Sequence, residues 1–540
     1  MTFISPAPGH DRPLASGLAV VIRVFVMGLI LAGHPGRAQE LAELIVPGGA
    51  GVTQEELRGW VSWLQARGFD PDRCGLDPVA GSLFLDIEAG APLGELEAAG
   101  FVVVSRQSGT PLEGSRRTQS EYYDPAEIEA LLQQVHADHP AITRLITVGT
   151  TFEGRTILGI EISDAPGIDE DEPAVLLNGQ HHSREVVTSH IVVDAIDTLT
   201  DGYGIDTTLT SWVDGVKTIC VPMVNPDGVQ HVFDVSSFWR KNRQTYPGGC
   251  TGVDLNRNYP YRWGPDRCGS TSSCASPTQT YEGPSSASEI ETQAMMALAA
   301  AHPLVIAVSY HSAGRFIDYP YACSSGLPSE IMPEHDVIHE MMNSMADAID
   351  AVDAVPRYSV FSPASAGALS GDDTSWYYAE KGVYSFIVEV GTSFEPPFSE
   401  VAGIVDRNRA GWQELYQRLE GARIDVHVAD AGTGQPLEAE VALLDYVYDT
   451  GEAPRWTHMP FGRFTYLVPG SDTYTVRASR PGYVTRDVAV AVGMAPEELT
   501  IALELVGGPS QVPALSTLAL GLLGLLFLAG GAVAVRRQTA

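Results

Sequence analysis

Apolar residues along the middle of the chain follow two spacings, which predict strands and helices in turn. Uninterrupted apolar runs predict buried strands, and they fall at residues 174–177, 219–224, 305–308 and 386–388. Helical spacing of apolar residues predicts helices between some of these strands, at residues 289–301 and 334–350. This alternation is typical of an α/β fold with a mixed, mostly parallel sheet flanked by helices.

Polar residues around position 124 predict where the first helix of this unit begins. Asp124 suits a helix N-cap, Pro125 suits the first helical position, and Glu127 completes a capping box. Apolar residues then recur at helical spacing, at Ile128, Leu131, Leu132 and Val135. We therefore expect the α/β unit to occupy residues 119–422.

The residues before this unit carry a pattern of their own. A helix is predicted at residues 54–66, where apolar residues share one face, and strands are predicted at 83–87 and 101–104. The stretch at 114–118 is polar and basic, which is typical of a linker open to proteases. We interpret residues 39–118 as a pro-segment or an accessory domain.

After the α/β unit the pattern changes to short alternating strands with frequent turns. Ile424, Val426 and Val428 alternate with polar residues, and a glycine-containing turn follows at 432–434. Further short strands and turns continue in the same way. The pattern predicts a small C-terminal β-sandwich over residues 423–506.

The N-terminus resembles a secretory signal peptide. An apolar stretch at 24–32 follows Arg12 and Arg23, and residues 36–38 form a small-x-small cleavage site. A transmembrane helix needs about 20 apolar residues, and Arg23 leaves too few. We therefore expect residues 1–38 to be a signal peptide and the chain to be exported.

The C-terminal residues 507–540 combine a linker with an apolar stretch. Residues 512–535 carry no charge and could span a bilayer as a helix, and Arg536 and Arg537 follow directly. Arginines in that place favour a cytoplasmic C-terminus, with the bulk of the chain outside. The tail resembles the sorting tails of Gram-negative bacterial surface proteins, and a plain membrane anchor is the alternative. We expect a protein tethered to the membrane at the cell surface, or secreted after the tail is processed.

The net charge argues against one class of partner, and the cysteine pattern argues against one class of metal site. The chain has 33 Lys and Arg against 67 Asp and Glu, a formal charge of −34, and so acidic a surface disfavours nucleic acid as a partner. Its six cysteines include no C-x-x-C pair, which disfavours a thiolate zinc site. Cysteines in the loops of an exported protein are more often disulfides, whereas Cys220 lies in an apolar run and is predicted to be a buried free thiol.

Three of the predicted strands end at side chains that bind metals. His182 and Glu185 follow the strand at 174–177, while His311 and Glu389 end two later strands. Functional groups gather beyond the carboxyl ends of strands in open α/β sheets. Two histidines and one glutamate, with a fourth position left for water, form a catalytic zinc set. A charged Glu389 after so apolar a run is costly without a partner, which also indicates a functional site.

Further motifs keep a fixed order around these residues. They are Y-Y-D-P-A-E-I at 122–128, G-T-T-F-E-G-R at 149–155, H-S-R-E at 182–185, N-P-D-G at 225–228, F-W-R-K-N-R at 238–243, G-V-D-L-N-R-N at 252–258, Y-E-G-P at 281–284, H-S at 311–312 and Y-P-Y at 319–321. Residues 121–420 thereby resemble the zinc carboxypeptidase family typified by carboxypeptidases A, B and T.

The resemblance implies a role for each residue of the catalytic centre. His182, Glu185 and His311 would bind one zinc ion, and Glu389 would be the general base that activates the attacking water. Arg240 matches the arginine that stabilises the oxyanion of the tetrahedral intermediate.

The resemblance also implies which residues orient the metal ligands and which bind the substrate. Asp254 matches the carboxylate that orients the first histidine ligand. Asn256 and Arg257 match the pair that binds the free C-terminal carboxylate of the substrate, and a guanidinium suits that task by making two charge-assisted bonds. Arg184 matches an accessory substrate-binding arginine.

One position departs from the family pattern. A mobile tyrosine usually lies nine residues before a tryptophan that matches Trp376, and here that place holds Gly367. A shifted register would place Ser362 there instead. Tyr358 is the nearest tyrosine, and an insertion would let it substitute. Whether a tyrosine folds over the substrate in this chain is therefore not decided by the sequence.

The side-chain pocket is predicted from one residue. The family residue two before the tryptophan lies at the base of this pocket, and here it is Thr374, which is neutral and small, with Asp372 and Asp373 beside it. This favours apolar or aromatic C-terminal residues, and mixed specificity stays open.

The resemblance also covers the loops and the C-terminal unit. The family often has a bridge in the loop flanked by Cys250 and Cys274, which makes them the first disulfide pair, and Cys268 with Cys323 is a second. The unit at 423–506 resembles the transthyretin-like domains that often accompany carboxypeptidase domains.

We expect an exported zinc metallocarboxypeptidase that removes C-terminal residues from peptides and proteins. One alternative is a relative that cleaves cell-wall peptides. The other is a non-catalytic peptide-binding ectodomain, which would be expected to have lost the metal set or Glu389. The pair Asn256 and Arg257 argues against an endopeptidase, because it requires a free terminal carboxylate.

Overall fold

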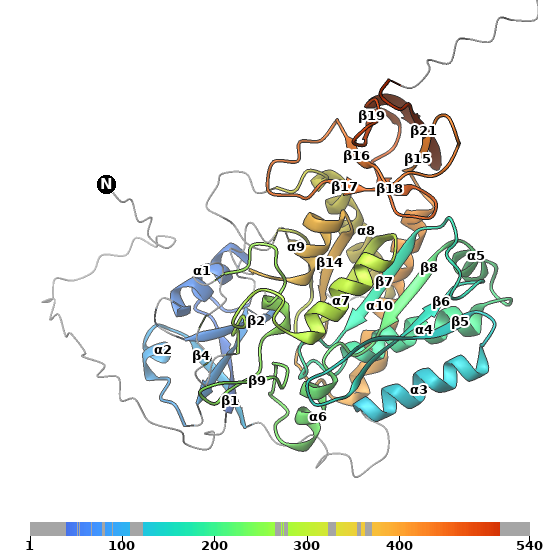
Figure 1. Ribbon diagram of the computed structural model, residues 1–540. Helices are drawn as coiled ribbons and strands as arrows, with labels where there is room; N and C mark the ends of the chain where they lie inside the picture. The colour runs from blue at the N-terminus through green and yellow to red at the C-terminus, as the bar shows by residue number, and fades with distance from the viewer. Residues whose placement is uncertain are drawn as a thin grey trace, which may run out of the picture.

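The computed structural model describes residues 39–108 with short gaps at 51, 53, 66, 68, 78–80 and 89, then 122–264, 279–321, 331–353, 358–361 and 370–507, together with Ser272 and Cys274. The predicted signal peptide at 1–38 and the apolar stretch at 512–535 lie outside these residues. In the part of the chain that is described, no helix has the length and apolar character needed to cross a membrane. Buried hydrophobic residues form three main cores, one in each of the units seen in Figure 1.

An eight-stranded mixed sheet forms the centre of the molecule, in the order β13-β12-β14-β11-β7-β8-β6-β5. Four strand pairs are parallel and three are antiparallel. The predicted mixed sheet is therefore confirmed. Its strands are β5 (Thr143–Thr150), β6 (Thr156–Ile162), β7 (Ala174–Gly179), β8 (Lys217–Val221), β11 (Leu304–His311), β12 (Phe316–Asp318), β13 (Ser359–Phe361) and β14 (Tyr384–Glu389).

Helices cover this sheet, and α10 packs against both α4 and α8. The first of them, α3, begins as the sequence predicts: Asp124 Oδ1 accepts from the Glu127 amide at 2.8 Å, and the Asp124 amide donates back to Glu127 Oε2 at 2.9 Å. The flanking helices are α3 (Pro125–Asp138), α4 (Thr188–Gly202), α5 (Thr207–Gly215), α6 (Pro226–Asp234), α7 (Ile290–Ala301), α8 (His335–Val352) and α10 (Phe398–Leu419).

The three central parallel strands, β7, β11 and β14, are adjacent and fully buried. Their burial on both faces explains why the sequence shows continuous apolar runs rather than alternation. His311 and Glu389 are register partners at the ends of β11 and β14. The carboxyl ends of all three strands therefore meet at one edge of the sheet.

The N-terminal unit is a four-stranded antiparallel sheet in the order β2-β3-β1-β4, with two helices. The predicted helix and both predicted strands are present, but β1 and β2 were not predicted. Its elements are β1 (Gln39–Ile45), α1 (Gln54–Gln65), β2 (Asp70–Asp77), β3 (Ser82–Glu88), α2 (Gly94–Ala98) and β4 (Val102–Ser108). In Figure 1 this unit lies to the left of the central sheet, in blue.

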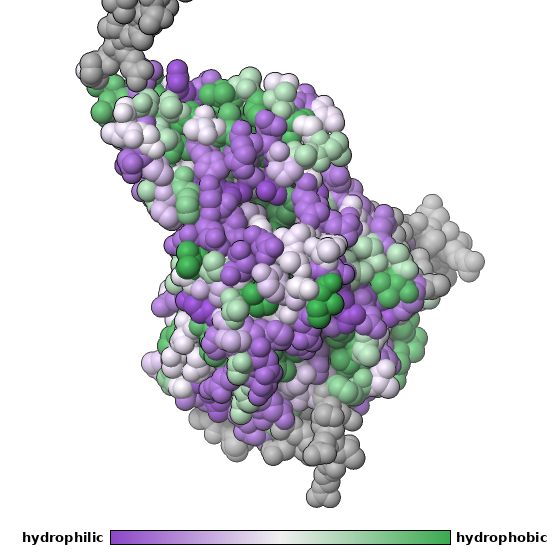
Figure 2. All heavy atoms as spheres, turned by 90° about the vertical axis from the view of Figure 1, so that its right-hand side faces the viewer, coloured by the Kyte–Doolittle hydropathy of each residue, from purple (hydrophilic) through white to green (hydrophobic). Residues whose placement is uncertain are grey.

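The C-terminal unit consists of two sheets with a shared core, in the orders β18-β15-β21 and β17-β16-β19-β20. The predicted small β-sandwich is confirmed, and it lies at the top of Figure 1. Its strands are β15 (Arg423–Asp430), β16 (Glu440–Leu443), β17 (Arg455–Trp456), β18 (Arg463–Leu467), β19 (Asp472–Ser479), β20 (Arg486–Val492) and β21 (Pro496–Leu503). On the face drawn in Figure 2, hydrophilic residues are interspersed with hydrophobic patches on this unit and on the one below it.

The cysteines agree with the prediction where they are described. Cys250 and Cys274 form a disulfide, with Cα atoms 5.6 Å apart. Cys220 is a buried free thiol, and burial raises its pKa. The other predicted pair, Cys268 with Cys323, lies outside the described residues.

Candidate metal centre and substrate site

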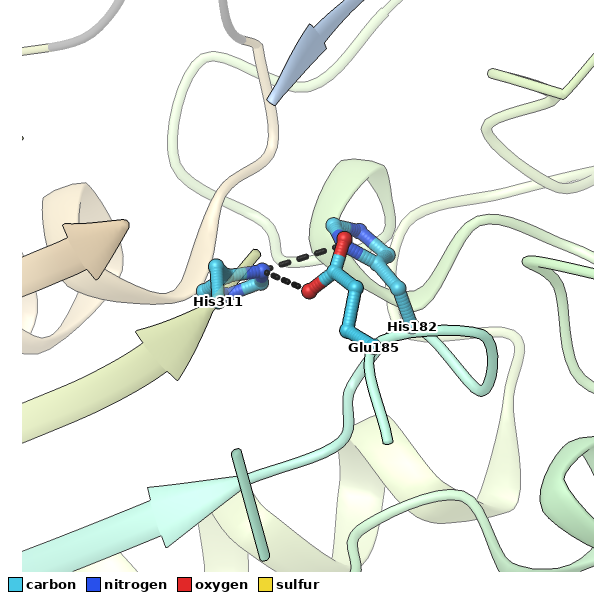
Figure 3. A group of neighbouring side chains, drawn as sticks. All are labelled: His182, Glu185 and His311. Atoms are coloured by element: carbon cyan, nitrogen blue, oxygen red, sulfur yellow. Dashed lines mark hydrogen bonds and ion pairs between the residues drawn. The ribbon is translucent and has the colours of Figure 1, made fainter. Parts of the chain in front are cut away.

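His182, Glu185 and His311 converge at the carboxyl edge of the central strands (Figure 3). His182 Nδ1 lies 2.7 Å from Glu185 Oε1, and His311 Nδ1 lies 3.0 Å from Glu185 Oε2. The two Nδ1 atoms are 3.0 Å apart. His182 and Glu185 come from the turn after β7, whereas His311 is the last residue of β11.

The donor set fits a zinc ion. One atom from each of the three residues lies within 4.8 Å of the others, and all three side chains are buried. Two imidazole nitrogens and a carboxylate oxygen are the ligands of many catalytic zinc sites. Elsewhere in the described ranges, no three His, Cys, Asp or Glu side chains come together in this way.

The far side of His182 is held by Asp254. His182 Nε2 lies 3.1 Å from Asp254 Oδ1, and Arg240 Nε donates to Asp254 Oδ2 at 3.0 Å. Burial alone would raise the pKa of Asp254, but Arg240, Arg257 and His182 hold it well below its usual value. A charged Asp254 thus fixes the ring so that Nδ1 faces the other two ligands.

The far side of His311 is held by Ser309, which the sequence analysis missed. Ser309 Oγ lies 3.1 Å from His311 Nε2 and donates to Asn178 Oδ1 at 3.2 Å. Burial lowers the pKa of His311 to about 4, although Glu185 opposes the shift. The neutral imidazole favoured by burial is the form that binds metals. Because side chains two apart on a strand share a face, the position of Ser309 could have been predicted from that of His311.

A second buried group lies behind the ligands and was also missed. His181 Nε2 lies 3.0 Å from the Tyr259 hydroxyl and 3.6 Å from Asp373 Oδ2. Burial, followed by His182, lowers the pKa of His181 to about 3. All three side chains are fully buried, so they act as packed polar support for the site.

The residues predicted to bind the substrate carboxylate lie beside this set. Asn256 and Arg257 belong to the short 3-10 helix η2 (Leu255–Arg257), and Asn256 Nδ2 is 3.5 Å from His311 Nε2. The Asp373 amide donates to Asn256 Oδ1 at 2.8 Å. Arg257 Nη1 donates to the Asn256 carbonyl at 2.7 Å, so both side chains are held by hydrogen bonds to the backbone.

The predicted base and oxyanion residue adjoin the metal set. Glu389 ends β14, is 3 % exposed, and is the register partner of His311. Arg240 Nη1 lies 3.7 Å from Glu185 Oε1. The predicted general base, the predicted oxyanion residue and the predicted carboxylate-binding pair thus lie around the three potential ligands.

Aromatic side chains line the side of the site where Arg184 lies. Its guanidinium carbon is 4.3 Å from the centre of the Phe394 ring, and Nη1 donates to the Phe238 carbonyl at 3.4 Å. On Phe394 packs Phe84 of β3, with ring centres 5.4 Å apart. Phe84, Phe238, Phe394 and Ala313 form a small buried hydrophobic cluster. The N-terminal unit therefore reaches the predicted substrate site, and sequence spacing gave no sign of this contact.

The pocket residue Thr374 lies in the short helix α9 (Asp373–Trp376). Asp372 caps this helix: its Oδ1 accepts from the Ser375 amide at 2.7 Å and from Thr374 Oγ1 at 2.9 Å. The Asp372 carboxylate is therefore engaged by its own helix.

The suggestion that Tyr358 replaces the family's mobile tyrosine is wrong. Tyr358 is buried in the core, its hydroxyl pairs with Asn408 of α10, and burial raises its pKa to about 12. A side chain packed there cannot fold over a substrate. The other two positions considered, Ser362 and Gly367, lie outside the described residues.

Known proteins match this chain in sequence. A metallocarboxypeptidase A-like protein of Trichophyton verrucosum is 30% identical over 300 residues, covering 54% of this chain and 68% of the relative. A zinc carboxypeptidase of Saccharothrix mutabilis subsp. capreolus is 40% identical over 145 residues, covering 26% of this chain and 33% of the relative. The chain thus spans about a third of one of these relatives and about two thirds of the other.

Solved structures match the fold. Carboxypeptidase A from Helicoverpa armigera superposes with a TM-score of 0.56 at 22% identity, covering 70% of this chain and 96% of that one. Thrombin-activatable fibrinolysis inhibitor also gives a TM-score of 0.56, at 20% identity, covering 71% and 98%. The sequence model of the zinc carboxypeptidases matches residues 128–411, more than half of the chain. This chain therefore belongs to the zinc carboxypeptidase family.

Proposed function

We propose that the chain is an exported zinc metallocarboxypeptidase that hydrolyses the C-terminal peptide bond of peptides and proteins. The observation that carries the proposal is the buried convergence of His182, Glu185 and His311 beside Glu389. Membership of a family of peptide hydrolases supports it.

Zinc, held by the three ligands, would polarise the scissile carbonyl and lower the pKa of the attacking water. Glu389 takes the proton of that water and later delivers it to the leaving amine. Arg240 stabilises the negative charge that develops on the carbonyl oxygen, because its guanidinium already lies at the metal set.

The substrate is recognised by its free terminus. Arg257 and Asn256 bind the terminal carboxylate, and Arg184 binds the peptide further from the end. Burial of these side chains strengthens each charge-assisted bond relative to water. A neutral Thr374, with its hydroxyl donated to Asp372, supports a preference for apolar or aromatic C-terminal residues.

We also infer that residues 39–118 are a pro-segment that blocks the site until it is removed. Phe84 supports this, because it packs on Phe394 next to Arg184. A peptide approaching Arg184 has to displace this ring. The polar, basic linker at 114–118 is the expected cleavage region.

The ends of the chain complete the proposal. Residues 1–38 direct export, the stretch at 512–535 tethers the protein to a Gram-negative cell surface or is removed, and the sandwich at 423–506 is a transthyretin-like accessory domain. The uncharged tail followed by Arg536 and Arg537 supports the tether.

The proposal is tested with paired peptides that differ only in having a free or an amidated C-terminus. The zinc-loaded chain, cleaved in its linker, should release single C-terminal residues from the free peptide alone. A chelator should abolish this release, and zinc should restore it. Internal cleavage of the amidated peptide would indicate an endopeptidase. Binding of the free peptide without cleavage would indicate the non-catalytic alternative.

A further inference from the structure

A loop of the C-terminal sandwich, residues 444–454, packs against the catalytic unit just behind its predicted pocket. The loop leads into β17, whose first residue, Arg455, is 4 % exposed. A buried arginine is costly unless its donors are used. The partners of Arg455 therefore indicate what the contact does.

Arg455 closes the end of a helix in the catalytic unit. Its Nη1 donates to the Tyr378 carbonyl at 2.5 Å and to the Ala379 carbonyl at 3.2 Å. These carbonyls belong to the π-helical turn η4 (Tyr377–Lys381), which continues α9 directly. The Ala453 amide adds a bond of 2.8 Å to the Ala379 carbonyl. Carbonyls at a helix end need partners from outside, and here the other unit provides some of them.

The residue after this turn is shaped to admit Arg455. Gly382 has φ +73°, which suits glycine, and a Cβ there would lie 2.8 Å from Arg455 Cδ. The arginine stem thus occupies space that any other residue at 382 would fill.

A buried carboxylate provides a second contact between the units. Glu334, the N-cap of α8, accepts a bond of 2.7 Å from the Tyr448 hydroxyl and a further bond from the Tyr378 hydroxyl. It is 2 % exposed. Tyr448 belongs to the sandwich loop, so Glu334 joins that loop to the same η4 turn.

The η4 turn is linked through α9 to Asn256, one of the two residues proposed to bind the substrate carboxylate. The Asp373 amide of α9 donates to Asn256 Oδ1 at 2.8 Å, and the Gly371 carbonyl accepts from the Tyr259 amide at 2.9 Å. Any shift of η4 would move α9, and with it the group that orients Asn256.

We propose that Arg455 of the C-terminal sandwich is a positioning residue for the carboxypeptidase site, holding residues 371–382 so that Asn256 and Thr374 meet the substrate terminus. The sandwich then contributes to catalysis by positioning residues of the catalytic unit, and it is not a functionally independent domain. The inference rests on the proposed function, and it makes Arg455 act through η4 and α9, without contact to substrate.

Arg455→Met tests the proposal, because methionine keeps the apolar stem and removes the donors. In the linker-cleaved chain, KM for a peptide with a free carboxylate should rise about tenfold, while kcat falls less than about threefold. Zinc content should stay at one per chain, and amide exchange in residues 371–382 should quicken. Arg455→Lys should recover part of the loss, since one charged donor is restored.

The matched control is Arg477→Met, on β19 of the same sandwich, where an exposed arginine pairs with Asp487. If Arg455→Met gives the KM and exchange of this control, the proposal is overturned. If Arg455→Met does not fold, Tyr448→Phe replaces it, with Tyr483→Phe as its control and the same expected contrast. If the unmodified chain cleaves nothing, the proposed function fails, and the exchange of residues 371–382 still decides the role of Arg455.

Discussion

Asp254 joins the two halves of the site at the scale of single residues. One carboxylate oxygen faces the first histidine ligand and the other accepts from Arg240, the predicted oxyanion residue. The carboxylate also caps η2, where it accepts from the Asn256 amide at 3.0 Å. One buried carboxylate thus contacts a candidate metal ligand, the predicted oxyanion arginine and the backbone of the predicted carboxylate-binding pair.

Arg257→Ala should weaken the binding of free-carboxylate peptides far more than that of amidated ones. The guanidinium is 1 % exposed, and removing a buried charged hydrogen bond costs about 1.5–3 kcal/mol, or roughly 10- to 100-fold in KM. KM values for the paired peptides provide the measurement, with zinc content as the control. An equal rise in KM for both peptides would show that Arg257 does not recognise the free terminal carboxylate.

Some residues of the candidate site could be predicted from the sequence, and others could not. The metal set could be predicted, because each ligand follows an apolar strand and belongs to a motif. Ser309 could have been inferred by strand alternation from His311. Phe84 and Arg455 could not, because they come from other units and their contacts depend on how the units pack.

At the scale of elements, buried strands were the easiest to predict. β7, β11 and β14 are continuous apolar runs, and their adjacency brings the strand-end residues together. β2 was missed because its sequence, D-P-D-R-C-G-L-D, is too polar to give a strand pattern. Edge and accessory strands of this kind are fixed by pairing with their neighbours rather than by local preference.

The loop before β7 carries a carboxylate whose charge opposes folding. Glu172 lines a cavity of about 290 Å³ between the catalytic unit and the sandwich. Burial raises its pKa from 4.5 to about 7; Lys217 and Arg463 oppose the shift, while Glu170 and Asp164 add to it. Between about pH 4.5 and 7 the folded state therefore binds more protons than the unfolded state, and stability falls as pH rises.

Glu172→Gln should remove this loss. We expect the variant to exceed the parent in free energy of unfolding by about 1 kcal/mol at pH 8, a value discounted for solvent screening, and by nothing at pH 4.5. Urea denaturation at the two pH values measures the difference, with the exposed Glu497→Gln as control. A gain that is equal at both pH values would rule out the buried charge as its cause.

At the scale of the whole molecule, two units flank the catalytic one and contact it at different places. The N-terminal unit reaches the predicted substrate side through Phe84, whereas the sandwich packs behind the pocket through Arg455. We propose that the first contact covers the predicted substrate site and that the second supports it.

Phe84→Ala should raise the activity of the uncleaved chain. Phe84 packs on the catalytic unit and is absent from the core of its own unit, so the N-terminal sheet should still fold. Replacing a buried phenylalanine by alanine costs about 3–5 kcal/mol of packing free energy. The N-terminal unit should therefore bind the catalytic unit at least tenfold more weakly. Peptide hydrolysis before and after linker cleavage gives the comparison, and the exposed Val102→Ala is the control. Unchanged activity in the uncleaved chain would show that Phe84 does not block the site.

The central claim is that three residues hold the metal while Glu389 moves the proton. Measuring zinc content and turnover together in Glu389→Gln tests this division most directly. We predict about one zinc per chain, unaltered binding of a free-carboxylate peptide, and a fall in kcat of at least about 10²–10⁴-fold, because the amide cannot accept a proton. Loss of zinc would make Glu389 a ligand, and near-normal turnover would place the base elsewhere; either result would contradict the account.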